Sequence, residues 1–163
     1  INFIPAKLFS QSISHIGIGL IIIGVTGSSI LKIEKIQFQE INEVIKIKNF
    51  DVRFRGVEVV EGPNYISQKG NFEVFIGNSF FTNLEPEKRF YNAGKQVTTE
   101  AAIHSTVFGD LYIALGDKNF SRESESWTTR IWFNPFTAWI WSGIFFIVLG
   151  GLISFFRLIK QKK

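Results

Sequence analysis

The sequence contains no cysteine and only two histidines among its 163 residues. The absence of cysteine excludes a disulfide scaffold, a thiol nucleophile, a zinc finger and iron–sulfur ligation. The scarcity of histidine, with only His15 and His104 present, sharply limits the hypotheses for acid–base and ligand chemistry. Charged residues are 20% of the chain, whereas hydrophobic residues are 45%. This balance excludes an intrinsically disordered chain, which needs low hydrophobicity and an excess of charge.

The net charge of +4 is concentrated at the two ends of the chain. Residues 1–31 hold a single charged side chain, that of Lys7, and the basic tail at 157–163 holds no acidic residue. All 14 acidic residues lie between Glu34 and Glu125, where basic residues nearly balance them. A nucleic-acid-binding module concentrates basic residues on its folded surface, so this distribution argues against nucleic acid as a partner.

Two long segments lack charge altogether. Residues 136–156 form an apolar run that would span about 30 Å as a helix, with tryptophans at its near end and Arg157 just beyond its far end. Residues 8–31 also lack charge and are rich in glycine, which is common in membrane helices because it allows neighbouring helices to approach closely. Both segments are therefore predicted to be transmembrane helices.

The first apolar run is too long for the apolar part of a signal peptide, and the chain starts at Ile1 rather than Met. These features favour the C-terminal part of a longer polypeptide. By the positive-inside rule, the basic tail at 157–163 is expected in the cytoplasm, and Lys7 agrees. Residues 32–135 then face the opposite side, which is the periplasm in a bacterium with an outer membrane.

Residues 32–135 have the pattern of a small β domain. Runs at 52–60, 72–76 and 80–84 are typical of strands, and Gly77-Asn78 predicts a two-residue hairpin between the last two. The residues expected to point inward from the first run are Val52, Phe54, Val57 and Val59. Further strands are expected at 45–47, 110–115 and 128–133, with turns at 62–64, 85–86 and 116–117. The predicted fold is a membrane protein in which two transmembrane helices flank a small all-β domain, a barrel or a sandwich.

His15 lies inside the first apolar run and is the strongest candidate ligand. On a helix it shares one face with Ser12, Gly19 and Thr26. An ionisable side chain inside a membrane is costly and tends to face a helix bundle or a cofactor, and Gly19 leaves room for a flat macrocycle or a helix. The alternatives are a hydrogen bond to a neighbouring helix or extension toward the cytoplasmic interface. One histidine supplies one axial ligand, so a bis-histidine haem needs its second ligand from outside this chain.

The predicted β domain offers weaker candidates. No nearby serine or paired carboxylate makes a catalytic set with His104, which is expected to be structural. Arg89, next to Lys88, can pair with an anionic group such as a haem propionate. The favoured alternative is a turn over residues 84–91 that local ion pairs stabilise. The remaining carboxylates do not suggest a glycosidase or a metal site.

Several short motifs, in order along the chain, resemble the C-terminal portion of the CcmF family, the cytochrome c haem lyase subunit of the cytochrome c maturation system. The matching stretches cover nearly the whole sequence and lie at 15–17, 62–65, 84–91, 99–103, 110–116, 134–141 and 149–151. A single motif such as Gly150-Gly151 would mean little, whereas the ordered set is specific.

The resemblance implies a polytopic inner-membrane protein that binds haem b through two histidines in membrane helices. His15 falls on the position of the second of these ligands, whereas His104 matches no family histidine. The resemblance further implies CcmE, CcmH and apocytochrome c as partners. The chaperone CcmE delivers haem, which becomes joined through thioether bonds to the Cys-x-x-Cys-His cysteines of apocytochrome c. The missing cysteines fit, because the reacting thiols belong to the apocytochrome.

This sequence departs from the family pattern in what it lacks. The Trp-rich haem-contact segment and the two periplasmic haem-ligating histidines are absent, and Trp139-Ile140-Trp141 lies in a predicted span and does not replace them. The chain is therefore expected to contribute one axial ligand, a periplasmic β domain and the last membrane helix, and not to catalyse ligation alone. A sister haem lyase dedicated to a nitrite reductase matches the same motifs. The other alternative is a membrane-anchored periplasmic binding or scaffolding module without a cofactor.

Overall fold

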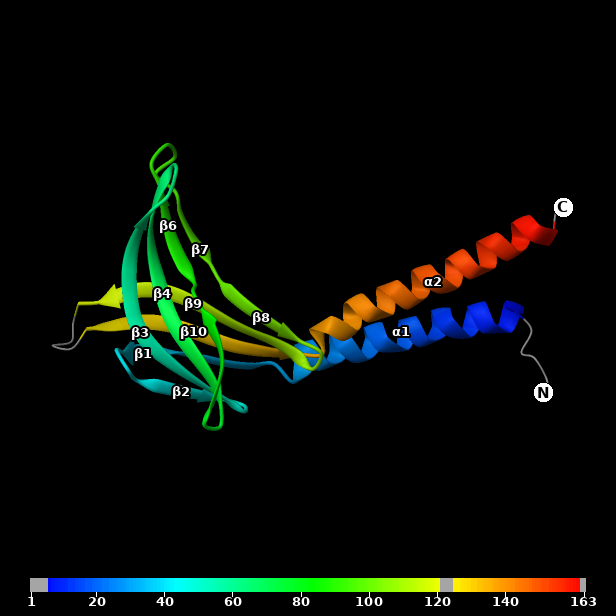
Figure 1. The fold of residues 1–163 in the computed structure, drawn as a ribbon, viewed down its shortest axis with the longest axis horizontal. Helices are drawn as coiled ribbons and strands as arrows, with labels where there is room; N and C mark the ends of the chain where they lie inside the picture. Colours follow the sequence, from blue (N-terminus) through cyan, green and yellow to red (C-terminus); the bar gives the residue numbers. More distant parts are fainter. Residues whose placement is uncertain (1–5, 121–124, 162–163) are drawn as a thin grey trace. The chain divides into compact units, whose positions relative to one another are not determined.

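The computed structural model describes residues 6–120 and 125–161, which form two compact units. One unit combines the two helical ends of the chain with residues 106–110, and the other contains Ile33–Ser105 and Leu111–Phe133. Figure 1 shows the two long helices and the β-strands that make up these units. The fold class predicted from the sequence, two apolar helices flanking a small β domain, is confirmed.

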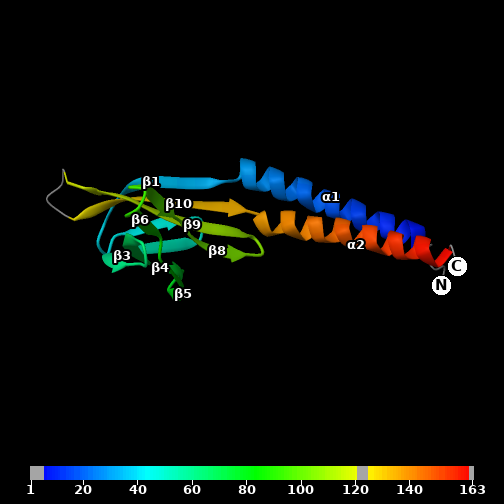
Figure 2. The same ribbon diagram turned by 90° about the horizontal axis from the view of Figure 1, so that it is seen from above.

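Helices α1 (Ala6–Ile30) and α2 (Thr137–Gln161) run antiparallel, side by side, as Figures 1 and 2 both show. Within them, Leu8–Ile30 and Thr137–Lys160 are long and apolar enough to cross a membrane. Only 17% and 11% of their most apolar stretches are buried, so neither is the core helix of a soluble domain. Their apolar side chains face outward, as in helices surrounded by lipid.

Helix α2 continues beyond Phe156, where the sequence analysis placed the end of the apolar span, as far as Gln161. No proline or glycine interrupts this part of the chain, and cations are favourable in the last turn of a helix, where Lys160 lies. The first residues of the basic tail are therefore helical. The side chain of Lys7 and both terminal lysines, Lys162 and Lys163, lie outside the described residues.

Small residues form the contact between the two helices. A Cβ added at Gly17 would lie 2.6 Å from the carbonyl oxygen of Gly143, and one added at Gly143 would lie 2.5 Å from that of Gly17. At Gly150 an added Cβ would collide with the hydroxyl of Ser14 and would lie 2.7 Å from the carbonyl oxygen of Ser10. Glycine is required at these positions because any side chain would force the backbones apart.

The strands of the second unit form two sheets. The four-stranded sheet has the order β1-β10-β9-β8, and the six-stranded sheet has the order β2-β3-β4-β6-β7, with β5 also paired to β4. The strand bounds are β1 (Ile33–Glu40), β2 (Val44–Ile47), β3 (Phe50–Glu61), β4 (Tyr65–Ile76), β5 (Ser79–Leu84), β6 (Glu87–Tyr91), β7 (Val97–Glu100), β8 (Ala102–Thr106), β9 (Gly109–Asn119) and β10 (Ser126–Pro135).

The core of the β unit lies between the two sheets. Phe54 and Phe72 come from the six-stranded sheet, and their ring centroids are 4.9 Å apart. Ile113 and Ile131 come from the four-stranded sheet, and all four side chains are fully buried. Burial of one such side chain contributes about 1.5–3 kcal/mol, so this apolar layer is the main stabilising feature of the unit.

The expected strands are all present, and Gly77-Asn78 forms the predicted two-residue turn between β4 and β5. Two details were wrong. Gly116-Asp117 is no turn but part of β9, where a Cβ on Gly116 would lie 2.9 Å from that of Thr128 on β10. Glycine there serves close packing against Thr128 and does not reverse the chain.

The second wrong detail concerns Val59, which was expected to be buried. Its register opposite Gln68 places it on the core-facing side of β3. The bulge at Gly56 (φ 122°) adds one residue after Phe54, so the inward positions shift by one from there on. The side chain is nevertheless 70% exposed. The β3–β4 hairpin extends beyond the strands that cover the core, as the upper part of Figure 1 shows.

Candidate functional site

Helix α1 has two faces of different character. The face with Gly17 and Gly24 contacts α2, whereas His15, Ser12 and Thr26 are exposed. These three residues and Gly19 recur at helical spacing and so form one stripe, which we call the His15 face. No described residue packs against this stripe closely enough to bury it. The stripe is therefore available to a cofactor or to another helix.

A single hydrogen bond sets the chemistry of the His15 ring. Its Nδ1 lies 2.7 Å from the carbonyl oxygen of Gln11, one turn earlier in the same helix. A carbonyl oxygen can only accept, so Nδ1 carries the proton and donates. With the proton on Nδ1, the neutral form of the ring has its lone pair on Nε2, the arrangement that an imidazole ligand needs to bind a metal centre. This hydrogen bond lies within α1 and involves no other described helix.

Gly19 follows His15 by one turn and differs from the contact glycines of α1. Nothing in the described chain lies within 4 Å of a Cβ added at Gly19, whereas one at Gly24 would lie 2.6 Å from the Ile140 side chain. Packing against α2 therefore does not require glycine at position 19. The structure places Gly19 beside His15 on the same face, as the helical spacing predicted.

Arg89 lies on β6 and so belongs to the β unit, whereas His15 belongs to the helical unit. Its Nε donates to Glu87 Oε2 at 2.7 Å, and its guanidinium lies 4.7 Å from the centre of the Tyr65 ring. The Ser67 hydroxyl donates to the same carboxylate oxygen at 3.0 Å. The hydrogen bond from Arg89 and, secondarily, that from Ser67 hold the pKa of Glu87 below its usual range, although partial burial opposes them.

The segment around Arg89 is not the turn that the sequence analysis favoured. Residues 87–91 form β6, which pairs with both β4 and β7. Lys88 points to the other face of this strand and pairs with Asp117 of β9. The predicted local ion pair exists between Arg89 and Glu87, but sequence spacing gave no indication of the distant partners Tyr65 and Asp117.

His104 packs as a structural residue. It is half-buried on β8, and its ring meets that of Phe81 edge to face with centroids 4.7 Å apart. In the described part of the chain, no group of three or more His, Cys, Asp or Glu side chains could hold a metal ion.

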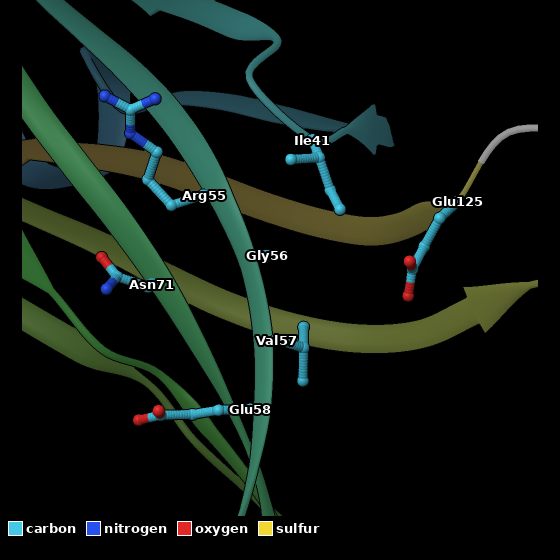
Figure 3. Close-up of a pocket in the computed structure, with 7 residues that line it drawn as sticks. All are labelled: Ile41, Arg55, Gly56, Val57, Glu58, Asn71 and Glu125. Atoms are coloured by element: carbon cyan, nitrogen blue, oxygen red, sulfur yellow. The ribbon is translucent and has the colours of Figure 1, made fainter.

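The β unit also contains a cavity of about 300 Å³ beside the β3 bulge (Figure 3). The charged side chains that line it come from β3 and from Glu125, just before β10, and each already has a partner. Arg55 donates to Asn42 Oδ1 at 2.7 Å and pairs with Glu73 at 2.9 Å. Glu58 pairs with Lys69 at 3.2 Å, and Glu125 pairs with Lys118 at 2.8 Å. These ion pairs are partly exposed and are typical of a solvated surface rather than a reactive site.

Comparison with known proteins gives a consistent result. The family model described as the CcmF C-terminal beta-sandwich matches residues 30–135. The chain is 35% identical over 159 residues to the cytochrome c-type biogenesis protein CcmF of Haemophilus influenzae, covering 94% of this chain and 24% of that protein. It is 33% identical over 143 residues to CcmF of Escherichia coli, covering 88% and 22%.

The fold has a counterpart among solved structures. A structure titled Cytochrome c Heme Lyase CcmF superposes with a TM-score of 0.70 at 14% identity, over 91% of this chain and 24% of that one. This chain spans about a quarter of the length of the relatives that it matches. The family match over the β unit and the identity to curated relatives along both helices establish that the chain belongs to the CcmF family of cytochrome c biogenesis proteins.

Proposed function

We propose that this chain supplies one transmembrane axial ligand, His15, to a haem b in a haem lyase that matures c-type cytochromes. The observation that carries the proposal is the state of the imidazole. Its Nδ1 proton is engaged by Gln11, so Nε2 keeps the lone pair, and the ring is exposed on a face that α2 does not cover. The donor set fits one axial position. The second ligand comes from a residue outside this chain.

The rest of the His15 face supports a flat ligand. Gly19 leaves open space one turn from the imidazole, where any larger residue would intrude. The hydrogen bond from Nδ1 to Gln11 restricts rotation of the ring and raises the basicity of Nε2. When bound, the haem supplies a one-electron redox centre within the membrane.

Arg89 has a smaller part in the proposal, as a partner for a haem propionate. Its guanidinium already bonds to Glu87 and lies over Tyr65, so a propionate would have to share it or to replace Glu87. Guanidinium groups bind carboxylates in two-pronged geometry, which makes sharing feasible. The His15 proposal does not depend on this contact.

The proposed activity is that of a longer protein, of the length of the CcmF relatives. That protein takes haem from the chaperone CcmE and joins it to apocytochrome c, with CcmH as a further partner. This chain has no cysteine, which is compatible with a reaction in which the apocytochrome provides both reacting thiols. We place the chain in the bacterial inner membrane with residues 32–135 in the periplasm, because the basic residues that end α2 favour the cytoplasm.

The experiment compares His15→Ala with His104→Ala in the full-length protein purified from membranes. Wild type is expected to show a low-spin haem b spectrum, and His15→Ala is expected to lose most of the haem because an axial ligand is missing. His104→Ala removes the other imidazole of this chain, at a position packed on Phe81, and is expected to keep the haem. Equal haem content in all three proteins, at equal helix content by circular dichroism, would remove His15 from the ligand set.

A membrane-anchored scaffold without a cofactor is the second candidate. The six-stranded sheet favours it, because Ile66, Phe90 and Val97 lie in one row by register and are 43%, 36% and 52% exposed. Such a row suits a protein partner. This candidate predicts that His15→Ala leaves cytochrome c maturation unchanged. The haem-ligand proposal predicts that the same substitution impairs maturation.

A further inference from the structure

The turn between β8 and β9 lies at the end of the four-stranded sheet where the chain connects to the two helices. In the order β1-β10-β9-β8, the chain enters β1 directly after α1 and leaves β10 directly before α2. Strands β8 and β9 are neighbours joined by two residues, Val107 and Phe108, so they form a hairpin. The antiparallel pairing of β1 with β10 brings both helix junctions to one end of the sheet, and the hairpin order places the Val107-Phe108 turn at that same end.

This turn is hydrogen-bonded to the beginning of α2. The backbone N–H of Phe136 donates to the carbonyl oxygen of Phe108 at 3.1 Å, and the indole Nε1–H of Trp139 donates to that of Val107 at 3.0 Å. Residues 106–110 accordingly belong to the same compact unit as the two helices. The position of the turn along the axis of α2 is therefore set by one bond from Phe136, directly before the helix, and one from Trp139 in its first turn.

The turn presents apolar side chains while both of its carbonyl oxygens accept hydrogen bonds. Val107 and Phe108 are 67% and 66% exposed. Their carbonyl oxygens accept the two bonds from the start of α2, and the Thr106 hydroxyl donates to the Gly109 carbonyl at 2.6 Å. No Asp, Glu, Lys or Arg occurs from residue 101 to residue 109. Hydrogen-bonded carbonyl oxygens and the absence of charge lower the cost of moving this segment into the edge of a bilayer.

We infer that Val107 and Phe108 insert into the interfacial region of the lipid bilayer beside the first turn of α2. The occupant of this surface is lipid, because the turn continues the apolar surface of a membrane-spanning helix at the level of Trp139. Tryptophan favours the boundary between headgroups and acyl chains, where its ring is in apolar surroundings and its N–H finds an acceptor. Here that acceptor is the carbonyl oxygen of Val107, so the Trp139 indole and the turn enter the interface together.

The absence of cysteine allows a direct test on the full chain in phospholipid vesicles. Single substitutions Val107→Cys and Phe108→Cys are labelled with a fluorophore that reports polarity, and nitroxide lipids quench it from a shallow or a deep acyl position. Phe145→Cys, on the exposed side of α2, is the control for deep insertion. Asn78→Cys, in the other two-residue β-turn, is the control for exposure to water.

Labels at Val107 and Phe108 are expected to be quenched at least twofold more by the shallow nitroxide than by the deep one, and to resist aqueous iodide. The Phe145 label should show the reverse nitroxide order, and the Asn78 label should be quenched by iodide alone. Two results would overturn the inference. Iodide quenching equal to that at Asn78 would place the turn in water, and protection from iodide without nitroxide quenching would mean that protein covers it. Circular dichroism of each labelled protein checks that the helices are intact.

Discussion

At the scale of single residues, hydrogen bonding to a backbone carbonyl decides which histidine nitrogen is available. Gln11 O accepts from His15 Nδ1, so the lone pair lies on Nε2. His104 has a different environment, because its ring packs edge to face on Phe81 in the β unit. Two residues of one type thus have distinct surroundings, and the difference lies in which atoms they contact.

The ion pair between Arg89 and Glu87 gives a prediction about pH. Because hydrogen bonding holds the pKa of Glu87 below its value in the unfolded chain, this carboxylate stabilises the fold above the unfolded pKa, and the stabilisation is lost as pH falls through the folded pKa. Arg89→Gln removes the main donor. We expect its thermal midpoint to fall below wild type at pH 7, and the difference to shrink in acid, where the carboxyl is protonated in both proteins.

Thermal unfolding at pH 7 and at pH 3, with NMR titration of the Glu87 carboxyl carbon, measures both quantities. Lys95→Gln is the matched control, since it removes one positive charge from the exposed turn after β6 without touching Glu87. A Glu87 pKa that is unchanged by Arg89→Gln would contradict the assignment of its cause.

At the scale of secondary-structure elements, the glycines of α1 divide according to their neighbours. Gly17 and Gly24 lie where α2 approaches most closely, whereas Gly19 borders open space next to His15. All of them look alike in the sequence, because glycine is common throughout membrane helices. Only the contact face distinguishes a glycine that joins two described helices from one that leaves room for a further ligand.

This division predicts that two glycine-to-alanine substitutions in α1 differ in their effect on the stability of the helix pair. Gly17→Ala places a Cβ 2.6 Å from the Gly143 carbonyl oxygen and is expected to weaken the helix pair by about 1–3 kcal/mol. Gly19→Ala meets no described atom and should leave the pair unchanged. Both gain the same helix propensity, so unfolding in mixed detergent and SDS micelles compares them directly. Equal stability of the two variants would contradict the proposed contact face.

At the scale of the whole molecule, charge is distributed by segment. The residues between the two apolar helices are nearly neutral, whereas the end of α2 is basic, with Arg157 and Lys160 in its last turns. Cytoplasmic flanks of membrane helices carry such an excess of Lys and Arg. The pI of 9.4 therefore reflects the chain ends and not a basic folded surface.

The proposed orientation predicts the location of two reporters. A reporter fused to the C-terminal end should be active in the cytoplasm. One inserted between Gly77 and Asn78, at an exposed hairpin turn, should be active in the periplasm. Enzymatic activity of alkaline phosphatase and fluorescence of a cytoplasmic fluorescent protein measure the two sides. The reverse pattern would overturn the orientation, and substitution of Arg157 and Lys160 by Gln should weaken it.

The sequence alone was sufficient for the features that depend on local patterns. Length and lack of charge predicted both apolar helices, and alternation with turn residues predicted the strands and the Gly77-Asn78 hairpin. Helical spacing also placed Gly19 beside His15. Each of these features depends on a few neighbouring residues, because backbone geometry repeats every two residues in a strand and every 3.6 residues in a helix.

The remaining features came only with the tertiary structure, because they join residues that are distant in the chain. Pairing of β4 with β6 brought Tyr65 to Arg89, and packing of the two sheets brought Asp117 to Lys88. The reach of the β3–β4 hairpin beyond the core exposed Val59. Hydrogen bonds from α2 held the Val107-Phe108 turn, which no motif had marked. Local periodicity contains no information on which strand ends meet a helix or which face another element covers. Long-range packing decides both.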